Sequence, residues 1–231
     1  ERGHVVYAGV DYEAILDDFG YGRAGDERAR AVVSEFATPF DLDRIDAAGD
    51  SVAVVGAAPS LPDEIDRVDD ADLVFAASTA ADVVRDAGIP VDLFVTNLDK
   101  NPETARELTA AGTPVAAHAH GDNVDLLEEW LPRLDPAHTL ATTQAAPVDA
   151  VYNFGGFTDG DRAAFLADAL GAAELRFVGW AFDDPTVGDE KARKLRWAER
   201  LLHLLERRRG DRFAVLDGRR GAIDPIPISD D

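Results

Sequence analysis

Apolar and polar residues recur along this chain with two different periods. Short apolar runs begin at residue 51, and longer amphipathic stretches separate them. The runs predict strands at residues 51–56, 72–78, 92–97, 114–120, 138–143, 175–179 and 213–217. The amphipathic stretches predict helices at residues 80–87, 102–111, 124–131, 160–170 and 190–209. This alternation predicts an α/β fold, with a mostly parallel, Rossmann-like sheet that carries helices on both faces.

The first 48 residues follow another pattern. Residues 12–20 and 27–36 have helical periodicity and precede the first predicted strand. No repeat, low-complexity linker or second set of core strands interrupts the remainder. We therefore predict a helical N-terminal extension over residues 1–48 and one α/β domain over residues 49–231. The pattern leaves the oligomeric state open, a homodimer included.

The charge of the chain limits its partners. Forty-five acidic residues against 23 basic ones give a formal net charge of -22, which argues against binding to nucleic acid or to an anionic membrane. An anionic small-molecule substrate would need a cation between itself and the protein. No apolar run approaches the length of a membrane span, and the first residues show no leader pattern, so we expect a cytoplasmic protein.

Lysine is scarce, because only Lys100, Lys191 and Lys194 occur among the 23 basic residues. Scarce lysine with abundant Asp, Glu and Ala is typical of proteins from salt-loving organisms, where molar salt shortens the screening length to about 3 Å. Lysine is a compact point charge that suits phosphate. We predict that all three bind phosphate groups; chance placement on a solvated helix face is the alternative for Lys191 and Lys194.

Two histidines crowd the end of the predicted strand 114–120. Side chains alternate along a strand, so His118 and His120 share a face, with Asp122 and Asn123 directly behind them. In open parallel sheets, ligands bind beyond the carboxyl ends of the strands. The cluster is therefore a candidate site. The alternative is a pair of buried histidines bonded to backbone.

Polar residues also follow the neighbouring predicted strand. Asn97, Asp99 and Lys100 leave it just ahead of a helix that begins near Pro102. Asp99 could cap that helix. Alternatively, Asp99 and Asp122 at adjacent strand ends form a hard-oxygen site for Mg²⁺, which takes one or two carboxylates together with substrate phosphates.

Two glycine-rich turns complete the predicted rim. In the first, Gly56 ends a strand, and Ser60 and Asp63 have the spacing of a capping box whose N–H groups could hold a phosphate. It does not match the dinucleotide fingerprint. The second joins two glycines to a helix start with acidic and basic side chains. Its candidate binding residues are Gly155, Gly156, Thr158, Asp159 and Arg162.

The motifs "GAAPSL", "VTNLDKNPE", "HAHGDN", "NFGGFTDGDRA" and "KARKLRWAERLL" occur in this order. Together they resemble the archaeal 6-hydroxymethyl-7,8-dihydropterin pyrophosphokinase family, which is similar in fold to thiamine pyrophosphokinases. The resemblance implies transfer of a pyrophosphoryl group from ATP to the pterin hydroxymethyl group, with release of AMP, on the route to folate or methanopterin. It places Asp99 and Asp122 on Mg²⁺. Where the family typically has a further aspartate, this chain has Asn97, whose carbonyl oxygen remains a possible ligand.

The general base stays open, because either His118 or His120 could accept a proton if its pKa were near the ordinary value. We take His120 with the two aspartates as the catalytic group.

Two other classes of function also stay open. One is a metal-dependent hydrolase, since His-x-His at a strand end can bind zinc. The other is a nucleotide-binding module without turnover.

Overall fold

The computed structural model describes residues 12–226. Six parallel strands form one sheet in the order β5-β4-β3-β2-β1-β6. Their bounds are β1 Ser51–Val55, β2 Leu73–Ala77, β3 Leu93–Thr96, β4 Val115–Ala119, β5 Thr139–Thr143 and β6 Glu174–Val178. The predicted parallel α/β fold is confirmed.

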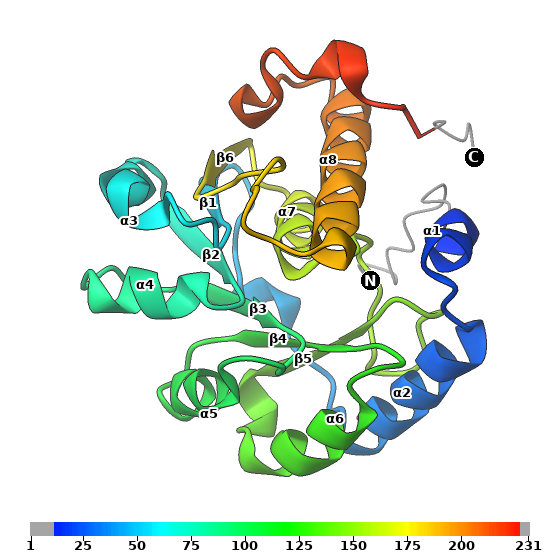
Figure 1. Cartoon of the computed structure of the whole chain (residues 1–231). Coiled ribbons are helices and arrows are strands. Elements are labelled where there is room, and N and C mark those ends of the chain that lie inside the picture. Colours follow the sequence, from blue (N-terminus) through cyan, green and yellow to red (C-terminus); the bar gives the residue numbers. More distant parts are fainter. Residues whose placement is uncertain (1–11, 227–231) are drawn as a thin grey trace.

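Helices cover both faces of the sheet (Figure 1). Their bounds are α1 Tyr12–Phe19, α2 Arg23–Phe36, α3 Leu61–Glu64, α4 Ala80–Asp86, α5 Pro102–Ala110, α6 Val124–Trp130, α7 Asp159–Ala169 and α8 Asp189–Arg209. Helices α1, α7 and α8 contribute to the apolar core on one face, and α2 to α6 to the core on the other. Alternate residues of each strand enter the two cores, which is why the strands are apolar throughout.

The last predicted strand, residues 213–217, is wrong. Its centre is a short 3₁₀ turn at Ala214–Leu216. Phe213 donates its N–H to Glu206 (2.6 Å) and accepts from Arg220 at its carbonyl (2.7 Å), so side chains satisfy the groups that a strand ladder would use. Phe213 and Leu216 pack into the core on the face covered by α8.

The two helices predicted near the N-terminus are present as α1 and α2. Helix α2 packs against α6, β4 and β5, and thus lies on the main sheet. The proposed division of the chain at residue 48 stays a prediction. No helix among residues 12–226 combines the length and the low polarity that a membrane crossing requires.

The order of the strands fixes where a ligand can enter. The chain runs from β1 stepwise to β5 and then returns to place β6 on the other side of β1. The connections on the two sides of this point lie on opposite faces of the sheet, so the carboxyl ends of β1 and β6 are where an open α/β sheet is expected to bind a ligand. Backbone bonds from the Gly56 N–H to the Val178 carbonyl and from the Ala58 N–H to the Gly179 carbonyl (both 2.9 Å) join these two ends.

Candidate active site

A cleft of about 1090 Å³ runs along the carboxyl ends of the strands. The segments after all six strands contribute to it, and residues near the N-termini of α2, α7 and α8 form its other walls. The predicted site residues that line it are Gly56, Asn97, Asp99, Lys100, His120, Asp122, Thr158, Asp159, Arg162, Lys191 and Lys194. The sheet therefore brings together residues that lie up to 138 positions apart.

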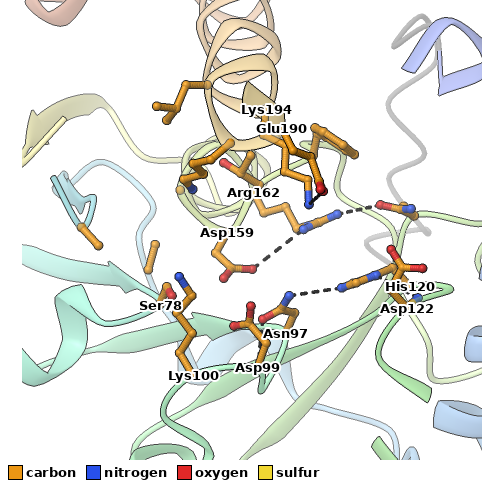
Figure 2. A pocket seen from close by; sticks show the side chains of 18 of the residues that line it. Ser78, Asn97, Asp99, Lys100, His120, Asp122, Asp159, Arg162, Glu190 and Lys194 are labelled. Atoms are coloured by element: carbon orange, nitrogen blue, oxygen red, sulfur yellow. Dashed lines mark hydrogen bonds and ion pairs between the residues drawn. The ribbon is translucent and has the colours of Figure 1, made fainter. Parts of the chain in front are cut away.

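Two carboxylates face each other across the centre of this cleft. Asp99 rises from the segment after β3, and Asp159 points toward it from the first turn of α7 (Figure 2). Burial raises the pKa of Asp159 to about 6; Arg162, with its Nη1 3.9 Å from Oδ1, opposes this rise, and the charge of Asp99 adds to it. Facing carboxylate oxygens are suitable ligands for a hard divalent cation.

The three lysines of the chain all line the same cleft. Lys194 is paired with Glu190 (2.9 Å) on the first turns of α8. The pKa of Lys191 is lowered, first because the surrounding protein displaces water and then because Lys100 adds like charge. A like-charged group of lysines beside the carboxylates is an arrangement that binds a polyphosphate.

His120 lies in the cleft wall between Asn97 and Asp122 (Figure 2). Burial, followed by the charge of Arg162, lowers its pKa to about 4, so the condition of a near-ordinary pKa is not met and the ring is neutral at pH 7. Its Nε2 lies 3.1 Å from the Asn97 amide nitrogen, and its Nδ1 faces the N–H of Asp122 at 3.3 Å. A neutral imidazole accepts at only one nitrogen. A carboxylate at position 97 could accept from Nε2–H, which the amide nitrogen cannot.

His118 shares the sheet face with His120, as predicted, but does not line the cleft. It is buried, and Nδ1 is bonded to the Thr142 hydroxyl (3.0 Å). The residue lines a small cavity that Arg162 also lines. Asn123 is buried as well, and its amide donates to the carbonyls of His118 (2.7 Å) and Asn97 (2.8 Å). Asn123 therefore holds the ends of β3 and β4 together.

The two glycine turns differ from expectation. Ser60 does not line the cleft or cap α3; its hydroxyl donates to Glu64 (2.7 Å) instead, so the predicted capping box is wrong. Gly155 and Gly156 also lie outside the cleft lining. Gly156 has a φ of +84° and lies so close to Arg162 that a Cβ atom would come within 2.7 Å of its backbone. The turn therefore packs closely against the first turn of α7.

The start of α7 explains how Asp159 and Arg162 reach the cleft. The buried carboxylate of Asp161 accepts from the N–H of Thr158 (2.9 Å) and from the N–H of Phe157 (2.5 Å). These bonds satisfy N–H groups that a helix N-terminus leaves without partners. The first turn is therefore held in place, with Asp159 directed toward Asp99.

Several cleft residues were not found from the sequence. Asp26 at the start of α2 is buried and accepts from the N–H of Gly121 (2.7 Å) and from the Gln144 amide (2.9 Å). Gln144 in turn accepts from Arg162 (2.8 Å). The N-terminal segment thus connects the ends of β4 and β5 to α7. Gln144 directly follows a predicted strand, which is a signal that could have identified it, whereas Asp26 lies in an ordinary helical pattern.

Trp180 was also missed. It follows β6 and lines the cleft beside the segment after β1. Its indole N–H donates to the Val54 carbonyl (2.9 Å), and a Cβ atom on Gly56 or Gly160 would come within 3.1 Å or 2.8 Å of its ring. Glycine at these two positions is therefore required for the indole to lie where it does.

The fold and the cleft define an α/β protein whose site, at the carboxyl ends of parallel strands, combines lysines with carboxylates as polyphosphate-binding proteins do. Residues 32–186 match the family model described as "6-hydroxymethylpterin diphosphokinase MptE-like". The chain belongs to this MptE-like family, as its motifs predicted.

Three archaeal relatives cover most of the chain, and each is named 6-hydroxymethyl-7,8-dihydropterin pyrophosphokinase. The protein of Methanothermobacter thermautotrophicus is 36% identical over 85% of this chain and 92% of its own. That of Pyrococcus furiosus is 35% identical over 84% and 91%, respectively. That of Methanocaldococcus jannaschii is 28% identical over 85% and 93%.

Proposed function

We propose that this protein transfers the diphosphoryl group of ATP to the hydroxymethyl group of 6-hydroxymethyl-7,8-dihydropterin, in a Mg²⁺-dependent reaction that releases AMP. Membership of the MptE-like family supports the pterin as acceptor. One observation supports ATP as the donor. Lys100, Lys191 and Lys194 all line a cleft that also contains Asp99 and Asp159. The cleft lining as a whole carries seven acidic against five basic side chains, so a polyanion that binds these lysines also needs a divalent cation to offset the carboxylates.

The reaction places modest demands on the protein. The acceptor oxygen forms a bond to the β-phosphorus while the bond from that phosphorus to the oxygen bridging to the α-phosphorus breaks. AMP leaves with the bridging oxygen, and the hydroxyl proton passes to water in the cleft. Such a displacement depends on in-line positioning and on stabilisation of phosphate charge more than on covalent chemistry. The lysines stabilise charge, and the rigid ends of the strands fix the geometry.

The residues present fit a magnesium ion. Asp99 and Asp122 stay the predicted ligands, and Asp159 faces Asp99 with a carboxyl group whose raised pKa reflects burial beside negative charge. Among residues 12–226 no cluster of three or more His, Asp or Glu side chains forms a complete metal site. A magnesium ion commonly takes one or two carboxylates and completes its shell with phosphate and water. When bound, the ion would neutralise phosphate charge.

A zinc hydrolase built on His118 and His120 gains no support from the geometry. The ring centroids are 6.3 Å apart; His118 Nδ1 is bonded to Thr142 and the residue lines a small cavity, whereas His120 faces the cleft. His4 lies outside the described residues. Zinc sites need three or four ligands on one ion.

The product assay tests the proposal directly. The protein is incubated with ATP, Mg²⁺ and the reduced hydroxymethylpterin in molar KCl, and nucleotides and pterins are separated by chromatography. We expect AMP and pterin diphosphate in equal amounts. ADP as the nucleotide product would show a simple phosphoryl transfer and refute the proposal. ATP binding without AMP would support the nucleotide-binding module instead.

A further inference from the structure

The cleft has two ends of different character. At one end, the floor segments 56–58 and 77–79 carry only Gly, Ala, Ser and Thr, and Trp180 forms the wall. At the other end, Tyr21 and Phe157 line the cleft beside the buried Asp26 and the polar side chain of Gln144. Asp99 and Asp159 face each other in the cleft (Figure 2), and Lys194 lies beside Tyr21, because its partner Glu190 (2.9 Å) also accepts from the Tyr21 hydroxyl (3.1 Å).

The end near Trp180 suits a nucleoside. It coincides with the carboxyl ends of β1 and β6, where the strand order reverses and where open α/β sheets bind nucleotides. Trp180 presents a flat ring whose orientation is fixed by its bond to the Val54 carbonyl and by edge-on packing against Phe177 (centroids 5.5 Å apart, 83°). Ser78 and Thr79 line the same end of the cleft, and their hydroxyl groups are of a kind that can hydrogen-bond a ribose.

The end near Tyr21 suits a smaller polar heterocycle. Tyr21 stacks on Phe19 (5.2 Å, 19°), which lies 5.2 Å from Phe157, so an aromatic cluster forms the wall. Asp26 and Gln144 are polar groups at this end, held in place by their mutual bond of 2.9 Å and by bonds to Tyr12, Gly121 and Arg162. A flat wall with a few fixed polar groups is the usual composition of a pocket that recognises a heterocycle.

The spacing of the strands gives an independent argument. Strands lie about 4.8 Å apart, so the point between β1 and β6 is about 12 Å from β3, whereas the point between β4 and β5 is only about 7 Å from it. Asp99 and Lys100 follow β3, and we take the end of β3 as the place where the reacting phosphate binds. In ATP, the base, the ribose and the α-phosphate lie before the β-phosphorus, so ATP needs the longer of these two distances. In the acceptor, the reacting hydroxyl is one carbon from the ring, so the acceptor needs the shorter distance.

Resting on the proposed function, we propose that the two substrates bind at opposite ends of the cleft. The adenine ring lies against Trp180, beside the ends of β1 and β6. The acceptor ring lies between the N-terminal segment and the end of β5, beside Tyr21 and Gln144. The N-terminal segment thus determines specificity for the acceptor.

Two variants separate the ends. Because stacking of a base on an aromatic ring contributes enough for about a tenfold change in affinity, Trp180→Leu should weaken AMP binding and raise KM for ATP about tenfold, with KM for the pterin changed less than twofold. Trp180→Phe keeps a ring and should restore most of the affinity. Tyr21→Ala should show the reverse pattern, with KM for the pterin raised more than KM for ATP. Because the Tyr21 hydroxyl donates to Glu190, the partner of Lys194, Tyr21→Phe is the control that removes this bond and keeps the ring.

Binding of AMP, measured by calorimetry without acceptor or turnover, separates this inference from the proposed function. If no pterin diphosphate forms but Trp180→Leu still weakens AMP binding, the proposed reaction fails and the nucleotide end stands. If the enzyme is active but Trp180→Leu raises only KM for the pterin, or if Trp180→Phe binds AMP as poorly as Trp180→Leu while both melt like the parent protein, the assignment of the ends is wrong.

Discussion

The carboxylate of Asp159 should make the folded protein less stable at neutral pH. Asp159→Asn should therefore raise the free energy of unfolding. The carboxyl group is 14% exposed, and burial raises its pKa from 3.8 to about 6. A group whose pKa is higher in the folded state favours folding when protonated, so its contribution is greatest below pH 3.8 and is lost as pH rises through 6. Asparagine has a similar shape and does not ionise, and it therefore keeps the folded state free of this cost.

The magnitude follows from the two pKa values. The pKa values of 3.8 and about 6 correspond to a cost of about 3 kcal/mol at pH 7.5, and the linkage relation reduces this cost to roughly half at pH 5. For a chain of 231 residues, about 3 kcal/mol corresponds to a rise in Tm of roughly 6–12 °C. The loss of a carboxylate that faces Asp99 should also reduce turnover, as expected where function depends on a destabilised group.

The assay is urea unfolding at pH 7.5 and pH 5 in molar KCl with EDTA, because a bound divalent cation would lower the pKa of Asp159. Glu128→Gln is the matched control. It removes an exposed carboxylate from α6, and should change the free energy of unfolding by less than about 0.5 kcal/mol at either pH. A gain for Asp159→Asn that is absent at pH 7.5, or equal at both pH values, would refute the reasoning.

Three further outcomes are expected. Asp99→Ala and Asp122→Ala should each lower kcat about a hundredfold, while Asn97→Asp should be tolerated, and near-normal rates for both alanine variants would exclude them as metal ligands. The double change of Lys191 and Lys194 to Gln should raise KM for ATP; an unchanged KM would show that the start of α8 is a solvated face. Dilute buffer, where the screening length reaches about 30 Å at 0.01 M salt, should lower Tm and weaken ATP binding relative to molar KCl. Equal Tm and equal ATP affinity at both salt concentrations would remove the interpretation as a halophilic protein.

The sequence by itself determined the sheet and most of the site. Apolar runs of strand length, alternating with amphipathic helices, have few solutions other than a parallel sheet covered on both faces. Because ligands bind at the carboxyl ends of such strands, the polar residues that directly follow a run, such as Asn97, Asp99, His120 and Asp122, could be assigned to one rim. The three lysines were found by their rarity.

The tertiary structure decided which strand-end residues face the cleft. His118 and His120 are two positions apart, yet the end of β5 covers one and leaves the other at the wall. Residues 213–217 alternate like a strand, but Glu206 and Arg220 satisfy the backbone of Phe213 and leave a 3₁₀ turn. Local periodicity cannot distinguish these cases, because burial depends on what packs from elsewhere in the chain.

Asp26 and Trp180 show the same limit. A carboxylate in an ordinary helix and a tryptophan after a strand carry no local signal of a site. They reach the cleft because α2 packs against β4 and β5, and because β6 lies beside β1 although more than a hundred residues separate them. Long-range packing therefore sets the composition of the two ends of the cleft, whereas the local pattern sets its centre.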